Sequence, residues 1–380
     1  MTLRQTIEQE IREHGPIPFS RYIELCLYDS ELGYYSRNAE QFGKAGDFYT
    51  SSDVHAVFGR LLARQFEEIW RLLGSPNRIE ILELGPGRGL FAQDVLDWSK
   101  KKFPEFFAAL HYSLAEKSPA LRQRLQATLE RYFQSRKVSL AAEGLVFDRI
   151  KNPVIVFANE FFDALPVDII SPAGQLRVSA KDGQLFETWY PPSPEALEFL
   201  DRYSVHPETG ERVEASLIAQ RYMSQIAAVI ERGIIIAIDY GYTRQEQLAG
   251  RHRGTIAAYR QHSVSENPYE APGEQDITAH VNFTALAAAA EAQEMQVKPL
   301  VTQSQFLMGI GEHNQFADVF EDCKLPQERA KVALQLKHLV TPAGMGETFH
   351  VMIASKDVDP EKVAELSGLI FGKALHKNES

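Results

Sequence analysis

One short segment, residues 79–90 (IEILELGPGRGL), constrains the fold of this chain more than any other. Its apolar start, residues 79–82, is typical of a buried parallel strand. Gly85, Gly87 and Gly89 follow, and they lack the Cβ atoms that would keep a ligand away from the backbone. A turn of this kind presents backbone N–H groups to a ligand at the amino end of a helix. The segment therefore predicts the nucleotide-binding corner of an α/β sheet.

The glycine spacing narrows the choice of ligand. A dinucleotide fingerprint would need Gly or Ala where Leu90 stands, and the Gly-Lys-Ser/Thr of a P-loop is absent from this segment. With Glu83 in front of it, the G-P-G-R-G run resembles the S-adenosylmethionine loop of class I methyltransferases. This resemblance implies that Glu83 helps to fix the loop and the methionine moiety. The alternative is a tight strand-to-helix turn that binds nothing.

A second acid is expected where a ribose would be held. Residues 111–119 (HYSLAEKSP) predict a short strand that ends at Glu116, and Ser118-Pro119 predicts a helix start. One carboxylate can accept hydrogen bonds from both hydroxyls of a diol, so Glu116 is a candidate ribose ligand. The alternative is a solvated acid at a strand end. Apolar residues at helical spacing predict a helix over 90–102 between the two strands.

The rest of the chain continues to alternate strands and helices. Its pattern predicts helices over 119–134 and 283–293, and strands at 145–147, 153–158, 233–241, 295–301 and 348–355. In the long gap before residue 233, a hairpin with its turn at Lys181-Asp182-Gly183 indicates an insertion. We therefore predict an α/β fold, a Rossmann-like seven-stranded sheet with an N-terminal extension and an inserted substrate region.

The same pattern predicts the domain boundaries. Residues 1–75 form a helical N-terminal extension with a lid loop, and residues 168–231 form an inserted substrate or cap region. Residues 76–167 and 232–356 form the cofactor-binding core, and residues 357–380 form a C-terminal tail.

Composition limits the partners and the compartment. The formal net charge is −11, which argues against a general nucleic-acid binder and favours a basic partner. Cys26 and Cys323 form no metal-like or redox pair, so we expect a reducing compartment and predict a cytoplasmic protein. The histidines show no HExxH motif, and no run of eighteen apolar residues occurs, so we expect no metal site and no membrane partner. A homodimer is an open expectation.

The loop after the strand at 153–158 contains the most suggestive chemistry. Asn159, Glu160 and Asp163 follow its carboxyl end, where ligands bind in open α/β sheets. A carboxylate there could hold a guanidinium or receive a proton, and Phe161 or Phe162 could form a wall. The alternative is that Asn159 caps a helix whose first turn contains both acids.

Two further clusters lie outside the predicted cofactor strands. Residues 44–52 (KAGDFYTSS) contain a turn-forming glycine, an acid and hydroxyl side chains, and are a candidate lid over the cofactor. Residues 272–283 bring Glu274, Asp276 and Thr278 close to His280, which is a candidate catalytic base. A capping segment is the alternative for each cluster, and a structural histidine is the alternative for His280.

Several motifs in order resemble one known family. The segments GPIPFSRYIELCLYD, LGYYS, GDFYTSSDVHAVFGRLLARQ, ILELGPGRG, NEFFDALPV, IDYGY and PGEQDITAHVNFTAL are similar to those of the MidA family. That family includes a mitochondrial arginine methyltransferase. The resemblance implies a class I fold, S-adenosylmethionine contacts by Gly85, Gly87 and Glu116, and Gly46, Asp47 and Tyr49 near the cofactor. Asn282 stands where Asp is common in the family, which argues against proton transfer at that position.

The first functional hypothesis is therefore a protein arginine N-methyltransferase in which Glu160 and Asp163 orient a guanidinium. A small-molecule O- or N-methyltransferase is the second. The third is an assembly factor that binds S-adenosylmethionine without turnover. An NAD-dependent oxidoreductase is disfavoured by Leu90. The roles of Asp239, Tyr240 and Asp276 remain open.

Overall fold

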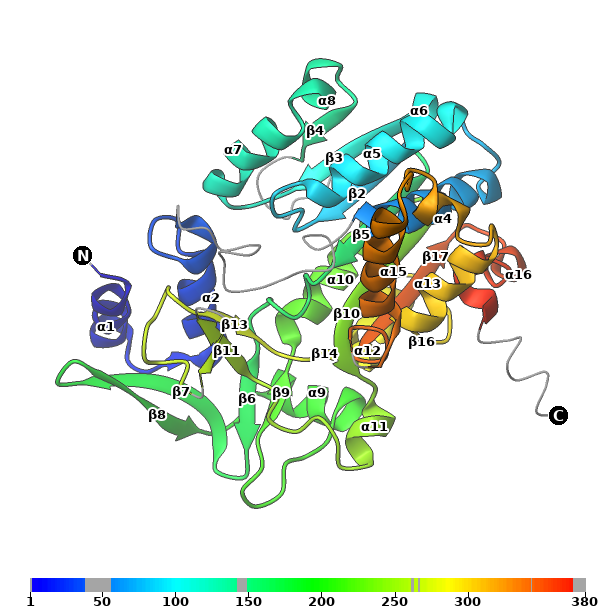
Figure 1. Ribbon diagram of the computed structural model, residues 1–380. Helices are drawn as coiled ribbons and strands as arrows, with labels where there is room; N and C mark the ends of the chain where they lie inside the picture. Colours follow the sequence, from blue (N-terminus) through cyan, green and yellow to red (C-terminus); the bar gives the residue numbers. More distant parts are fainter. Residues whose placement is uncertain are drawn as a thin grey trace.

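The computed structural model describes residues 2–37, 56–141, 149–260, 263–265, 267–342 and 344–371. At its centre lies a mixed sheet with the strand order β15-β17-β10-β5-β2-β3-β4 (Figure 1). These strands are β15 Gln296–Val297, β17 Phe349–Lys356, β10 Gly233–Tyr242, β5 Val154–Asn159, β2 Ile79–Leu84, β3 Leu110–Ala115 and β4 Val138–Leu140. Two short strands extend it, since β14 (Val281–Asn282) pairs with β10 and β16 (Val301–Thr302) with β17. The predicted α/β fold class is confirmed.

The strand order identifies the edge at which a ligand would bind. Strands β10, β5, β2, β3 and β4 run parallel, whereas β17 is antiparallel to β10. The connections reverse direction beside β2, because β3 lies on one side of it and β5 on the other. Ligands bind at the carboxyl ends of strands at such a switch point. The glycine run leaves β2 there and residues 159–163 leave β5, so the topology brings both motifs to one edge.

Alternate strand residues face two different cores. One face, which includes Ile81 and Phe157, packs against helices α4, α5, α6 and α13; the other, which includes Leu82 and Val156, packs against α10 and α12. These helices are α4 Ala56–Leu72, α5 Leu90–Lys102, α6 Pro104–Ala109, α10 Leu217–Val229, α12 Phe283–Glu291 and α13 Gln303–Glu312. Each presents one apolar stripe to the sheet, as helical periodicity requires. Four further helices are α7 Pro119–Thr128, α8 Glu130–Gln134, α11 Arg244–Leu248 and α16 Pro360–Val363.

A second, smaller unit packs beside the carboxyl edge of the sheet (Figure 1). Its strands form the sheet β1-β7-β6-β9, with β8 pairing with β7, and a separate sheet β12-β11-β13. Its elements are α1 Leu3–His14, β1 Ile17–Pro18, α2 Phe19–Tyr28, the 3-10 helix η1 Tyr34–Ser36, β6 Asp168–Ser171, β7 Gly174–Lys181, β8 Gln184–Tyr190, α9 Pro194–Tyr203, β9 Val213–Ala215, β11 Ala257–Arg260, β12 Ser263–Ser265 and β13 Asp276–Thr278. Because Ile17 pairs with Val178, the N-terminal extension and the insertion share one sheet.

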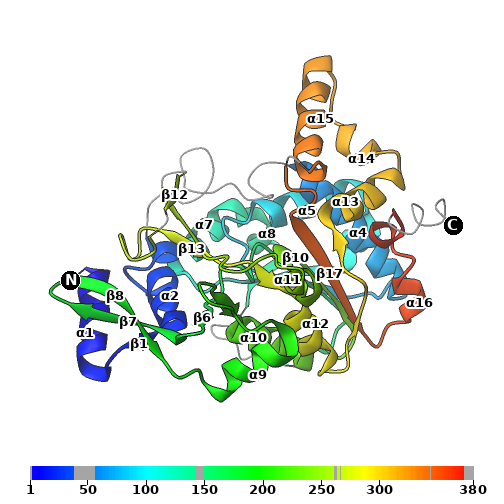
Figure 2. The same cartoon turned by 90° about the horizontal axis from the view of Figure 1, so that it is seen from below.

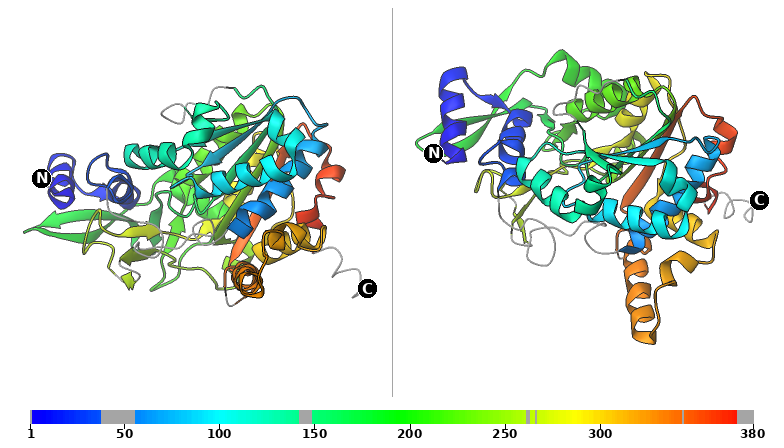
Figure 3. Two further views of the ribbon diagram at one scale, coloured as in Figure 1. Left: turned by 45° about the horizontal axis from the view of Figure 1, so that its top comes forward. Right: turned by 90° about the horizontal axis from the view of Figure 1, so that it is seen from above.

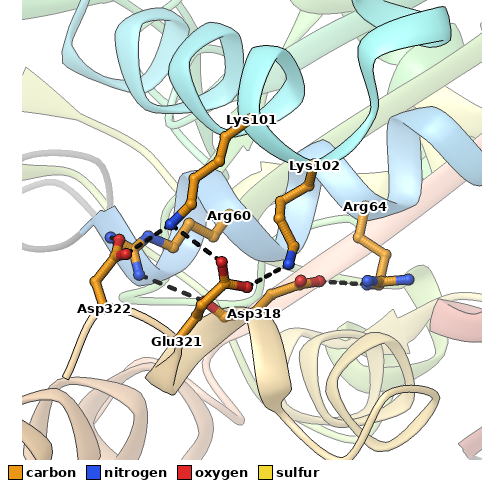
Figure 4. A network of polar contacts seen from close by, with 7 residues as sticks. All are labelled: Arg60, Arg64, Lys101, Lys102, Asp318, Glu321 and Asp322. Carbon is orange, nitrogen blue, oxygen red and sulfur yellow. Dashed lines mark hydrogen bonds and ion pairs between the residues drawn. The ribbon is translucent and has the colours of Figure 1, made fainter. Parts of the chain in front are cut away.

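A polar network fixes the helices that follow β16. Helix α14 (Ala317–Phe320) and the turn after it contact α4 and α5 (Figure 4). Asp322 accepts from Arg60 at 2.7 Å and from Lys101 at 2.6 Å, Asp318 pairs with Arg64, and Glu321 pairs with Lys102. Helix α15 (Pro326–Val340) then projects away from the body of the molecule (Figures 2 and 3). No helix in the described ranges is both long and apolar enough to cross a bilayer.

Most of the predicted elements are confirmed, and the exceptions have local causes. The predicted helix over 119–134 is divided at Leu129 into α7 and α8. The predicted strand over 295–301 is interrupted between β15 and β16, where Pro299 has no N–H group for the ladder. The strand predicted at 145–147 lies outside the described residues, and β4 occupies the edge beside β3. The domain boundaries stay a prediction.

Candidate functional site

The glycine run forms a left-handed turn between β2 and α5. Gly85, Gly87 and Gly89 have φ angles of 62°, 53° and 79°. A Cβ on Gly85 would lie 2.9 Å from Phe161, and a Cβ on Gly89 would lie 2.7 Å from Leu125, so these two glycines permit close packing. A Cβ on Gly87 would meet no atom of the described residues within 4 Å. Of these three glycines, Gly87 is therefore the one whose missing side chain leaves open space against the backbone.

Glu83 is a buried acid at the end of β2. It is 5% exposed and accepts a hydrogen bond of 2.8 Å from the Tyr112 hydroxyl on β3. Burial raises the pKa of the Glu83 carboxyl to about 8, and the hydrogen bond from Tyr112 opposes this shift. Glu83 is thus mostly protonated at neutral pH in the ligand-free protein.

Glu116 follows the end of β3, as predicted. Its carboxylate accepts from the Ser118 backbone N–H at 2.8 Å, and burial raises its pKa to about 7. The Ser118 hydroxyl donates to the Tyr35 carbonyl at 2.6 Å, which ties the N-terminal extension to this corner of the sheet. The acid therefore lies between the core and the second unit.

Asp239 organises the loop that follows β5. Its side chain is 1% exposed and accepts from the backbone N–H groups of Phe161 at 3.2 Å, Phe162 at 3.0 Å and Asp163 at 3.3 Å. It also accepts from the Tyr240 backbone N–H at 3.0 Å. Burial and the neighbouring Asp163 and Glu160 carboxylates raise its pKa well above the ordinary range. Asp239 is thus a positioning residue that joins β10 to the loop after β5.

That loop contains the predicted acids in an unusual backbone geometry. Residues 160–163 form no helix, so Asn159 is not a helix cap; its side-chain amide donates to Glu160 at 3.0 Å. Glu160 has a φ of 51°, a left-handed conformation that is rare outside glycine. Asp163 is buried, and within the described ranges its Oδ1 atom has no hydrogen bond of ordinary geometry, although the Tyr240 hydroxyl lies near the carboxyl group. Burial raises the pKa of Asp163 to about 6, opposed by the Tyr240 hydroxyl.

Tyrosines of the N-terminal extension complete the cluster. Tyr28 donates to the Ala164 carbonyl at 2.9 Å, and Tyr35 donates to Asp276 at 2.9 Å. Burial, and the negative charges of Asp276 and Asp163, raise the pKa of both tyrosines. Asp276 therefore faces the same cluster as Asp163, although it belongs to the second unit.

His280 is held in a histidine pair. Its Nδ1 atom lies 3.1 Å from Nδ1 of His252, and its ring meets Tyr240 edge-on with centroids 5.2 Å apart. Burial, with a smaller contribution from His252, lowers the pKa of His280 to about 4. A neutral imidazole with so low a pKa is a weak base, which favours the structural alternative. Its catalytic role stays a prediction.

Three predicted site residues, Gly46, Asp47 and Tyr49, lie outside the described residues, as does the lid segment to which they belong. Sequence reasoning missed Tyr28 and Tyr35 as members of the cluster. Asn282 caps α12, because its side chain accepts from Ala285 N at 3.0 Å and donates to the Tyr203 carbonyl at 2.9 Å.

Comparison with known proteins agrees with this geometry. A family model described as "Putative S-adenosyl-L-methionine-dependent methyltransferase" matches residues 61–301. The chain is 28% identical over 381 residues to "Protein arginine methyltransferase NDUFAF7 homolog, mitochondrial" of Drosophila melanogaster, covering 92% of this chain and 83% of that protein. It is 26% identical over 376 residues to the Homo sapiens protein named "Protein arginine methyltransferase NDUFAF7, mitochondrial", covering 90% and 80%. A Burkholderia thailandensis structure bound to S-adenosyl-homocysteine is 27% identical, with a TM-score of 0.79 and coverage of 96% and 94%.

These relatives correct one prediction. The predicted cytoplasmic location is wrong, because the curated relatives are named as mitochondrial proteins. The prediction rested on two cysteines that form no pair, which indicate a reducing environment but do not distinguish one reducing compartment from another.

Replacing Asp239 should loosen the loop that contains Glu160. Asp239→Ala leaves the backbone N–H groups of residues 161–163 without their acceptor, so we expect their hydrogen exchange to become about tenfold faster or more. Asp168→Ala is the matched control, since Asp168 is also buried and accepts from Ser20 elsewhere. Unchanged exchange at 161–163 in Asp239→Ala would contradict the positioning role.

Stability of the ligand-free protein should fall as the pH rises through the range set by Glu83. Its folded pKa of about 8 lies above the unfolded value of 4.5, so the folded state binds more protons and loses stability between these pH values. Glu83→Gln, which keeps an acceptor for Tyr112, should reduce the loss between pH 5 and pH 8 by about 3.5 kcal/mol. Urea unfolding at both pH values measures this, with the partly exposed Glu80→Gln as control. An equal loss in Glu83→Gln and wild type would refute the assignment.

Proposed function

Because the chain belongs to the family of S-adenosyl-L-methionine-dependent methyltransferases whose model matches residues 61–301, we propose that it methylates arginine residues of a protein. Family membership confirms the resemblance to the MidA family and the predicted cofactor. Two observations support the arginine acceptor. The curated relatives are named as protein arginine methyltransferases, and the net charge of −11 suits a basic substrate.

The residues at the switch point fit S-adenosylmethionine, which supplies an activated methyl group when bound. The open space at Gly87 lets the cofactor approach the backbone of the turn, and Gly85 and Gly89 keep that turn tightly packed. Glu116 would accept hydrogen bonds from the ribose hydroxyls. Glu83 would help to fix the turn, because it lies near the end of β2, directly before the turn begins.

Within the structure, the acceptor assignment rests on one observation, which is the pair of acids that follows β5. Asp163 has a buried carboxylate oxygen for which the described part of the chain provides no hydrogen bond of ordinary geometry, and Glu160 lies three residues before it in the loop fixed by Asp239. A guanidinium offers several N–H donors in a planar fork, which can satisfy two carboxylates at once. Asn159 would orient Glu160 through their 3.0 Å hydrogen bond.

Asp163 also suits the removal of a proton. As the new N–C bond forms, the guanidinium nitrogen must lose a proton to keep the product from carrying two charges. Asp163, with a pKa of about 6, is mainly ionised at neutral pH and can take that proton, while Glu160 holds the remaining N–H groups. Orientation of the acceptor would supply most of the acceleration, since the methyl donor is already activated.

Filling the open space at Gly87 should weaken cofactor binding. In Gly87→Ala the added methyl group meets no atom of the described chain within 4 Å, so the fold has room for it but the cofactor does not. We expect calorimetric affinity for S-adenosylmethionine to fall at least about tenfold. Gly183→Ala is the control, because Gly183 has a φ of 78°, also faces open space, and lies in the turn between β7 and β8. Equal affinity in both variants would contradict the role of Gly87.

Removing the charge of Glu160 should slow methyl transfer strongly and preserve cofactor binding. We expect Glu160→Gln to slow transfer of labelled methyl groups to protein arginine about 100-fold, because one oriented carboxylate is lost. The acceptor is a protein extract from cells that lack the gene, and methylarginine is identified by mass spectrometry after hydrolysis. Glu294→Gln is the control, since Glu294 is an exposed glutamate with a φ of 65°.

Two other results would redirect this proposal. Cofactor binding by the wild-type protein without methylarginine in the extract would refute the arginine acceptor and favour a small-molecule substrate or a non-catalytic role. Full activity of Glu160→Gln would keep the reaction and refute the assigned residue.

A further inference from the structure

A cavity lies in the second unit, which is formed by the N-terminal extension and the insertion. Its volume is about 420 Å³, within the range of sites that bind small molecules or side chains. Its buried walls include Phe19 of α2, Ile169 of β6 and Ala258 of β11, and its more exposed lining includes Glu187 and Arg212. We call it the side pocket. None of the residues assigned above to cofactor or acceptor lines it.

The side pocket contains a buried acid that is only half satisfied. Glu214 is the central residue of β9 and is 0% exposed. Its Oε1 atom accepts from the Thr255 backbone N–H at 2.6 Å, but its Oε2 atom has no hydrogen-bond partner among the residues that the structure describes. An unpaired carboxylate oxygen in a buried strand destabilises a fold unless a ligand donates to it. Glu214 therefore points to a hydrogen-bond donor from outside the chain.

The other charges of the side pocket cancel one another. Arg212 donates to both oxygens of Glu187, at 2.8 Å and 2.6 Å, and the Tyr269 hydroxyl adds a third hydrogen bond to Glu187 at 3.1 Å. The Arg212 guanidinium also lies over the Trp189 ring, 5.3 Å from its centroid. With this pair neutralised, Glu214 is the remaining acid of the cavity; burial raises its pKa to about 7, so it is partly ionised at neutral pH and a cationic ligand would favour its ionised form. A ligand with a positive charge matches it.

The side pocket and the candidate site lie on opposite sides of one sheet layer. In the β11–β13 ladder, Ala258 pairs with Ile277, and Tyr259 pairs with Asp276. Neighbouring pairs of a ladder face opposite sides of a sheet. Ala258 lines the side pocket, whereas Asp276 accepts from Tyr35 in the acid cluster. The side pocket is thus a second acidic site, separated from the acid cluster by the β11–β13 sheet.

We propose that the side pocket binds a lysine or arginine side chain of the protein substrate, with its cationic group on Glu214 and its aliphatic stem between Phe19 and Ile169. The identification of the bound protein as the substrate rests on the proposed function, but the recognition of a basic side chain does not. Apolar walls around a single buried carboxylate suit this ligand class, because lysine and arginine place a charged head on a hydrocarbon stem.

Calorimetric titration with N-acetyl-L-arginine N-methylamide tests the proposal without any methyl transfer. We expect binding that weakens at least about tenfold for the uncharged citrulline analogue and for Glu214→Gln, because one charge-assisted hydrogen bond is lost. The amide oxygen introduced by Glu214→Gln would still accept from the Thr255 backbone N–H, so the fold should be kept. Glu208→Gln, which changes an exposed acid before β9, should bind as wild type does.

Two further variants make the result unambiguous. Ala258→Leu fills the side pocket while keeping Glu214, and it should also abolish binding of the probe. Because the candidate site is also proposed to bind arginine, the Glu214→Gln change is repeated in a Glu160→Gln background, where it should still weaken probe binding at least about tenfold, whereas loss of all binding in Glu160→Gln alone would assign the probe to the candidate site instead. Unchanged S-adenosylmethionine affinity shows that each variant is folded. Absence of binding to the wild-type protein, or equal binding of the citrulline analogue, would refute the side pocket and leave the methyltransferase assignment intact.

Discussion

The interaction on which the candidate site depends is the set of four backbone hydrogen bonds accepted by Asp239. This carboxylate at the end of β10 gathers the N–H groups of residues 161–163 and of Tyr240. The Glu160 backbone N–H donates to the Ile238 carbonyl at 3.0 Å, and the bonds to Asp239 then hold the three residues that follow against the end of β10. Residues separated by about eighty positions in sequence are thus fixed as one surface, to which the extension adds Tyr28 and Tyr35.

A shared electrostatic property follows from this arrangement. Glu83, Glu116, Asp163 and Asp239 all have raised pKa values, and burial is the main cause in each case. Burying acids without cations costs free energy, which cationic ligands would recover. The methyl donor has a sulfonium charge and the proposed acceptor a guanidinium charge. Selectivity for positively charged reactants would therefore be a property of the empty protein, present before either ligand binds.

The sequence predicted those features that have a local signature. Strand periodicity and the glycine run located β2, the turn and α5, and strand ends located Glu116 and the loop after β5. Contacts between distant segments were not predictable: Tyr35 and Asp276 are 241 positions apart, and no pattern in either segment indicates the other. The alternative in which Asn159 caps a helix failed because Glu160 has a left-handed backbone and because Asp239 accepts from the N–H groups of Phe161 and Phe162, which a capping Asn159 side chain would have bonded. No sequence pattern indicated that Glu214 is buried either, since a single acid in a short strand normally faces solvent.

The backbone of Glu160 also has an evolutionary consequence. Left-handed positions are occupied at little cost by glycine and asparagine, whereas glutamate is held there only by its surroundings. Substitution by either residue would relieve strain while it removes the carboxylate. If Glu160 holds the acceptor as proposed, substitution at this position would give well-folded descendants that still bind the cofactor but no longer transfer methyl groups. A single substitution at Glu160 could thus convert an enzyme of this fold into a binding protein, and selection for stability would not oppose that substitution.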